Sequence, residues 1–120
     1  AHRARKLLGG GMRQVGVLAA AALYALDHHV ERLADDHANA IRLGEQLRSL
    51  DKLDVDMDVV DSNMVFVNIP EGASTPLQAY LHARGILVNG SEPKMRLVTH
   101  LDCGADEVDL FVDEIRGFFA

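Results

Sequence analysis

The chain has 120 residues, of which 48% are hydrophobic and 25% are charged, and its formal net charge is -6. This composition is typical of one soluble globular domain with a modest core, and the negative charge argues against nucleic acid or a membrane surface as a partner. The only cysteine, Cys103, excludes an intramolecular disulfide and a cysteine-built zinc cluster. No apolar run reaches the roughly 18 residues of a membrane span. We therefore expect a cytoplasmic protein with no metal site and no membrane partner.

The first eleven residues form a basic segment that we expect to contain the end of a helix starting upstream. The chain begins without methionine, so we expect a fragment of a longer protein. Three glycines, residues 9–11, are followed by Arg13 and a helical pattern. Glycines allow close backbone approach, a helix start offers unpaired N–H groups, and a guanidinium suits phosphate or carboxylate. This stretch is either an anion-binding corner or a flexible loop, and the sequence chemistry alone leaves both open.

The residues that follow predict two helices. The first begins at Met12, is rich in alanine, and has small faces that would allow another helix to approach closely. Asp27 is a candidate N-cap or kink before the second, amphipathic run, whose apolar stripe includes His37. We expect His37 to lie in a core or an interface.

From residue 50 the pattern changes to short strands alternating with helices. The predicted elements are a strand at residues 55–59, a turn at 61–63, a strand at 64–67, a helix from Ser74 or Thr75 to Gly85, a strand at 86–88, a turn at 89–90, a strand at 95–99 and a helix at 108–119. We predict an α+β fold: long N-terminal helices, then a small, mostly antiparallel sheet covered by helices on one face. Residues 1–50 would be connecting or interface helices and residues 51–120 a small α+β subdomain, together one domain.

Four stretches carry a family resemblance: residues 5–14, the alanine-rich residues 18–26, residues 61–67 and residues 95–102. In this order and at these separations they resemble the low-specificity L-threonine aldolases, which are fold-type-I enzymes that use pyridoxal 5'-phosphate (PLP). The resemblance extends over essentially the whole chain but covers only the C-terminal third of the family's sequence. It implies a lyase of amino-acid metabolism that cleaves L-threonine or L-allo-threonine to glycine and acetaldehyde.

The resemblance also implies the roles of individual residues. Arg96 matches the strand arginine that binds the substrate's α-carboxylate, although a strand arginine is otherwise often a rim residue or a surface ion-pair partner. Arg13 matches an arginine that reaches the PLP phosphate of a neighbouring subunit, and Lys6 matches a supporting lysine near that phosphate. Gly10 and Gly11 would form the turn of this cofactor-binding corner. The implied assembly is a homo-oligomer, which we expect to be a tetramer.

The catalytic residues of the family have no counterpart here. The lysine that holds PLP as a Schiff base follows a serine-rich strand end, and Lys6, Lys52 and Lys94 lack that context. We therefore expect no catalytic residue within the fragment and no activity from it alone. Two alternatives remain open: another fold-type-I PLP lyase of β-hydroxy amino acids, or a stand-alone α+β module for small-molecule binding or oligomerisation.

Overall fold

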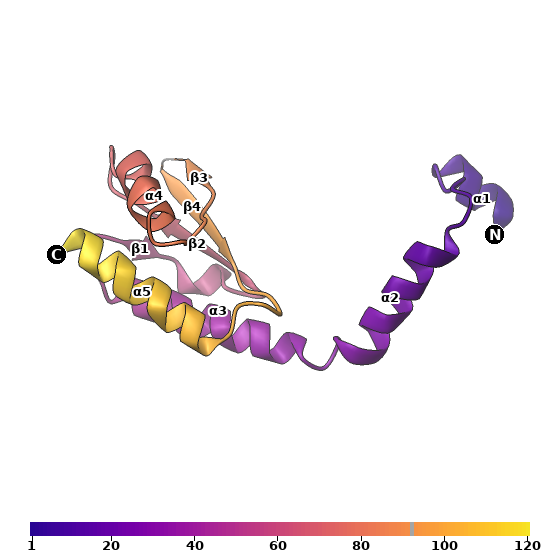
Figure 1. Cartoon of the computed structure of the whole chain (residues 1–120), viewed down its shortest axis with the longest axis horizontal. Helices are drawn as coiled ribbons and strands as arrows, with labels where there is room; N and C mark the ends of the chain where they lie inside the picture. The colour runs from indigo at the N-terminus through magenta and orange to yellow at the C-terminus, as the bar shows by residue number, and fades with distance from the viewer. Residues whose placement is uncertain (92) are drawn as a thin grey trace. The chain divides into compact units, whose positions relative to one another are not determined.

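The computed structural model describes residues 1–91 and 93–120, and it divides into two compact units, residues 1–33 and 34–120. The helices of the first unit are α1 (His2–Leu7) and α2 (Gly16–His28). The second unit contains α3 (Leu33–Arg48, which begins at the boundary), β1 (Asp54–Val55), the short 3-10 helix η1 (Met57–Val59), β2 (Met64–Asn68), α4 (Ser74–His82), β3 (Gly90–Ser91), β4 (Lys94–Val98) and α5 (Ala105–Phe119) (Figure 1).

The strands of the second unit form an antiparallel sheet in the order β1-β2-β4-β3. In the central pair, Val65 lies opposite Leu97 and Val67 opposite Met95, and all four side chains are buried. The alternate residues of the same strands are more exposed, because successive side chains of a strand point to opposite faces. The sheet therefore has one face in the core and one open face, as the sequence predicts.

Three helices cover the buried face and complete the core. The buried residues that they contribute are Ala40, Leu43 and Leu47 of α3, Leu77 and Leu81 of α4, and Val108, Val112 and Ile115 of α5. Polar contacts join the helices to one another at the surface. Arg42 of α3 binds Asp109 of α5, with Nε 2.8 Å from Oδ1, and Tyr80 of α4 donates to Glu114 of α5 at 3.1 Å. The predicted α+β fold with helices on one face is confirmed.

Helices α1 and α4 end in the same type of C-terminal capping motif. In α4 the N–H of Ile86 donates to the carbonyl of Leu81, and Gly85, at φ +78°, donates to His82. This pair of hydrogen bonds around a left-handed glycine is a Schellman motif, so the prediction that Gly85 ends this helix is confirmed.

Other local predictions were wrong. Residues 57–59 form a 3-10 helix because the side chain of Asp56 accepts a hydrogen bond from the N–H of Asp58, which turns the backbone away from the strand. Residues 86–88 form no strand, and the N–H of Ile86 is already bound to the end of α4. β3 begins at Gly90, so Asn89 and Gly90 are not the turn of the hairpin.

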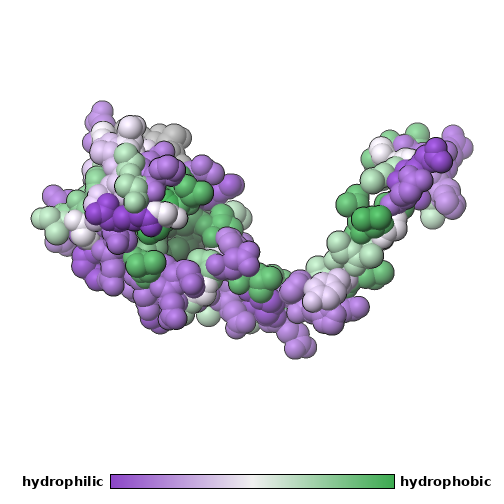
Figure 2. Space-filling model, viewed as in Figure 1, coloured by the Kyte–Doolittle hydropathy of each residue, from purple (hydrophilic) through white to green (hydrophobic). Residues whose placement is uncertain are grey.

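The N-terminal unit also differs from expectation. α2 begins at Gly16 instead of residue 12, because Gln14 takes a left-handed φ of 53° that interrupts the helix. It continues through Asp27, which is therefore neither an N-cap nor a kink. No residue of α2 is buried by the described part of the chain, and Figure 2 shows apolar side chains along this helix.

Two further observations complete the fold. His37 is exposed, because the buried side of α3 is formed by Asp36, Ala40, Leu43 and Leu47, so it lies outside the core of this chain. Among the described residues, no helix is long and apolar enough to cross a membrane. The predicted division into residues 1–50 and 51–120 stays a prediction, although within this chain α3 packs with the sheet.

Candidate functional site

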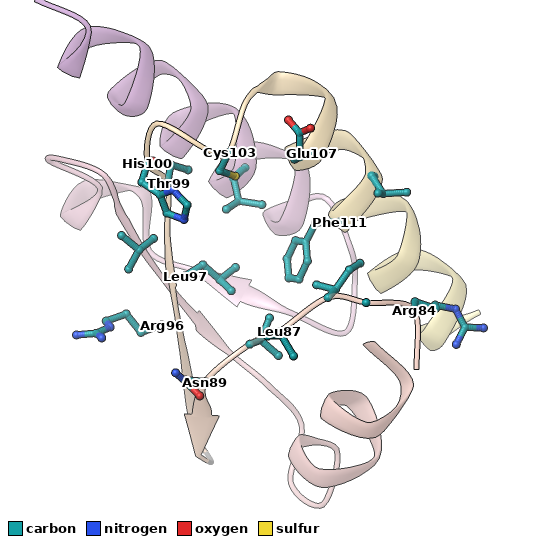
Figure 3. A pocket seen from close by; sticks show the side chains of 16 residues that line it. Arg84, Leu87, Asn89, Arg96, Leu97, Thr99, His100, Cys103, Glu107 and Phe111 are labelled. Carbon is teal, nitrogen blue, oxygen red and sulfur yellow. The ribbon is translucent and has the colours of Figure 1, made fainter. Parts of the chain in front are cut away.

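Arg96 lies in the middle of β4 and on the open face of the sheet. Its neighbours Met95 and Leu97 point into the core, so strand alternation directs the guanidinium outward. Figure 3 shows Arg96 on the opposite side of β4 from Leu97 and Phe111. Phe66 is its register partner on β2, and this residue is 37% exposed on the same face.

The surroundings of Arg96 are unusual for a surface arginine. Around it the open face carries Met64 and Val98, a cross-strand apolar pair, together with Phe66. Within the described part of the chain, its guanidinium makes no hydrogen bond or ion pair; Lys94, two residues along the strand, adds a second cation to the face. A planar guanidinium beside apolar side chains is suited to bind a carboxylate through two parallel hydrogen bonds once the face is covered by protein.

A cavity of 590 Å³ lies on the other side of β4, between this strand, residues 84–89 and α5. Its wall includes Leu97, Phe111 and Cys103 (Figure 3). Burial raises the pKa of the Cys103 thiol, and the carboxylates of Glu107 and Asp36 raise it further. Since the thiolate is the reactive form, Cys103 is a poor nucleophile in this setting. Most of the exposed cavity wall is apolar. Arg96 is among the lining residues, although Figure 3 shows its side chain directed to the other side of β4.

The glycine stretch in the first unit proves to be a helix end. The N–H of Gly9 donates to Lys6 at 3.1 Å and the N–H of Gly10 to Arg5 at 2.7 Å, with Gly9 at φ +85°. This is the same Schellman motif that ends α4. The N–H of Gly11 donates to the carbonyl of Gly9 at 2.9 Å. All three glycine N–H groups are therefore already bonded within the loop, so this stretch is not the open helix start that its sequence suggests.

The cations on either side of this loop are exposed. Lys6 lies in the last turn of α1, and Arg13 follows the loop; neither side chain has a hydrogen bond or ion pair to any described residue. Next to Arg13, Gln14 occupies a left-handed backbone conformation, which is uncommon for a residue with a side chain. An ammonium and a guanidinium suit the phosphate of PLP, so the donor set fits that group through side chains, whereas the glycine N–H groups do not contribute free donors.

The predicted site residues fall in both units. Lys6, Gly10, Gly11 and Arg13 belong to residues 1–33, and Arg96 belongs to residues 34–120. Their roles toward substrate and cofactor stay predictions. Sequence reasoning missed Arg5, whose side chain donates to two carbonyls of the glycine loop. Its spacing of five residues from Gly10 is the signal that could have found it, because this is the spacing that a Schellman motif brings together. Among the described residues, no group of three or more metal-binding side chains is present.

Comparison with known proteins gives consistent results. A model of the beta-eliminating lyase family matches residues 1–70. The low-specificity L-threonine aldolase of Escherichia coli K12 is 45% identical over all 120 residues, and low-specificity L-threonine aldolase 1 of Arabidopsis thaliana is 39% identical over 83% of the chain. The chain covers 35% and 29% of these two proteins, so it spans about a third of the length of the curated relatives it matches.

A solved structure supports the fold. L-threonine-O-3-phosphate decarboxylase from Porphyromonas gingivalis matches with a TM-score of 0.61 over 82% of this chain and 32% of that chain, at 18% identity. At this identity the match shows a shared fold. The α+β fold class and the resemblance to the low-specificity L-threonine aldolases are both confirmed.

Proposed function

The chain belongs to the beta-eliminating lyase family, which is PLP-dependent, and from this premise we propose that it is the C-terminal third of a threonine aldolase. The complete enzyme would cleave L-threonine or L-allo-threonine to glycine and acetaldehyde. Bound PLP supplies the electron sink that such a carbon–carbon cleavage requires. The 120 residues alone would be inactive.

The observation that carries this proposal is the setting of Arg96. It is an exposed guanidinium without a partner among the described residues, beside Phe66 on a half-apolar sheet face. Covering that face would remove water and strengthen a hydrogen-bonded ion pair with the α-carboxylate of an amino-acid substrate. In this position Arg96 binds and orients the substrate and transfers no proton.

Lys6 and Arg13 are proposed to hold the phosphate of PLP with their side chains, at the corner formed by Gly10 and Gly11. Their exposure and the lack of a partner within the described residues support this role. We also propose an oligomer, expected to be a tetramer. In α2, Val17, Leu23 and Leu26 are each at least 60% exposed in this chain, so the rest of the enzyme or another copy would cover them. A helix that is apolar all round is normally covered by protein on several sides.

A chimera tests the proposal. The matched third of the Escherichia coli aldolase is replaced by this chain, and the purified chimera is assayed for bound PLP by its visible absorbance and for glycine release from L-threonine. We expect both, whereas the Escherichia coli protein without this third and the 120-residue chain alone should show neither. A chimera that melts cooperatively yet neither retains PLP nor cleaves threonine would contradict the proposal.

A further inference from the structure

We propose that Arg5 is a positioning residue for the phosphate site: it fixes the loop of residues 9–12 and thereby the direction in which Arg13 leaves the loop. This inference rests on the proposed function, because it acts through Arg13. Arg5 itself contacts the loop backbone. Its Nε donates to the carbonyl of Gly10 at 2.7 Å and its Nη2 to the carbonyl of Met12 at 3.4 Å.

The two Schellman motifs of the chain provide an internal comparison. The residues that occupy the paired positions in the α4 stop are Leu81 and Ile86, and both belong to the hydrophobic core. Such an apolar contact is the usual companion of this motif. In the α1 stop the same two positions are Arg5 and Gly10, and a hydrogen-bonded guanidinium replaces the apolar pair. The C-terminal end of α1 is thus stabilised by the side chain of Arg5, which also contacts the backbone just before Arg13.

The identity of Gly10 follows from this arrangement. A Cβ at position 10 would lie 2.6 Å from Cγ of Arg5 and 2.8 Å from its carbonyl oxygen, distances at which the side chain or the backbone must move. A Cβ at position 11 would meet nothing within 4 Å. Of these two neighbouring glycines, only Gly10 is required by the close approach of Arg5.

The backbone is constrained on both sides of Arg13. The carbonyl that Arg5 binds, that of Met12, belongs to the peptide group that joins Met12 to Arg13. On the other side, Gln14 is held at φ 53°. Strained backbone of this kind persists where the surrounding structure determines it and is frequent at ligand-binding positions. Losing the Arg5 hydrogen bonds would release the loop and spread Arg13 over many orientations, at an entropic cost to phosphate binding.

The test is a titration of the complete apoenzyme with PLP and, separately, with pyridoxal, which lacks the phosphate. We expect Arg5→Ala to raise the dissociation constant of PLP about tenfold, which corresponds to about 1.4 kcal/mol of binding free energy. The dissociation constant of pyridoxal should stay unchanged. Arg3→Ala, which removes a charge from the same helix, is the matched control and should have no effect. Gly10→Ala should reproduce Arg5→Ala, because its Cβ would displace the side chain of Arg5.

A double-mutant cycle with Arg13→Ala makes the mechanism testable. If Arg5 acts through Arg13, Arg5→Ala should have no further effect on PLP affinity once Arg13 is absent. Additive effects, an equal loss of pyridoxal affinity, or an Arg5→Ala variant equal to Arg3→Ala would each overturn the inference while leaving the role of Arg13 intact. An Arg13→Ala variant with wild-type PLP affinity would instead overturn the proposed phosphate role and this inference with it. Gly10→Ala keeps the test decisive if Arg5→Ala does not fold.

Discussion

At the residue scale, Arg96 and Lys94 offer a matched comparison. They lie two positions apart on the same face of β4, and both are exposed cations. In the complete enzyme we expect Arg96→Ala to raise KM for L-threonine at least about tenfold, because a hydrogen bond to a charged group contributes roughly 1.5–3 kcal/mol. Lys94→Ala should change KM little. Steady-state kinetics would contradict the carboxylate-binding role if the two variants behaved alike.

The pair of Arg42 and Asp109 predicts a pH effect on stability. The hydrogen bond from Arg42, assisted by one from Gln46, lowers the pKa of Asp109 to about 2. The pKa of an aspartate in an unfolded chain is about 3.9. The folded-state pKa is thus the lower one, so the pair's stabilisation is complete above about pH 4 and is lost as the pH falls through about 2.

Asp109→Asn should therefore lower the melting temperature at neutral pH and flatten its fall between about pH 4 and pH 2. Melting curves followed by circular dichroism across this pH range measure the difference between variant and wild type. Arg42→Ala should produce most of the same flattening, and adding Asp109→Asn to it should remove only the smaller part that comes from Gln46. An undiminished slope in both variants would show that this pair does not contribute to acid sensitivity.

At the element scale, the N-terminus of α5 is capped by the side chain of Glu107, a residue in its first turn. Oε2 of Glu107 accepts a hydrogen bond from the N–H of Gly104 at 2.9 Å. We expect Glu107→Ala to lower the free energy of unfolding by about 0.5–1 kcal/mol, the usual contribution of a helix cap. Urea titration of the 120-residue chain measures this loss. Glu107→Gln keeps an acceptor oxygen and should recover most of it; equal losses in both variants would assign the effect to charge instead of capping.

The elements also show which parts of the fold could be predicted from sequence. Helices with a strong apolar stripe, such as α5, and strands with buried alternation, such as β2, were found because burial and local periodicity agree. Residues 57–59 alternate like a strand, yet the side chain of Asp56 competes for the backbone and forms a 3-10 turn. The glycine loop follows the end of α1, as expected for the first eleven residues, but it does not lead directly into the next helix, because α2 begins only at Gly16.

Some features of the candidate site could likewise be predicted from the sequence, and others could not. The outward direction of Arg96 follows from strand alternation, so the sequence alone could place it on a face. The hydrogen bonds of Arg5 could not be predicted from composition or period, because they depend on a side chain that folds back over a helix end. Nor did the glycine pattern reveal that the N–H groups of Gly9, Gly10 and Gly11 are already used within the loop.

At the scale of the whole molecule, the two units differ in what they bury. Every buried core residue lies between Ala40 and Ile115, and none of the described residues 1–33 is buried. Removing residues 1–33 from the 120-residue chain should therefore change the free energy of unfolding by no more than about 0.5 kcal/mol, as for surface changes. Urea unfolding of the shortened chain tests this, and limited proteolysis of the full chain should cleave first within residues 1–33. Loss of cooperative unfolding on truncation would show that the first unit stabilises the second.

The uncovered helix α2 has a consequence for the life of the protein in a cell. Apolar segments that remain in contact with water are what chaperones bind and what leads to aggregation. In these 120 residues alone, residues 16–28 stay in contact with water. Until the rest of the complete enzyme or another copy covers this segment, quality control would recognise it, so the cellular amount of the protein would depend on that covering step as well as on the stability of its folded core.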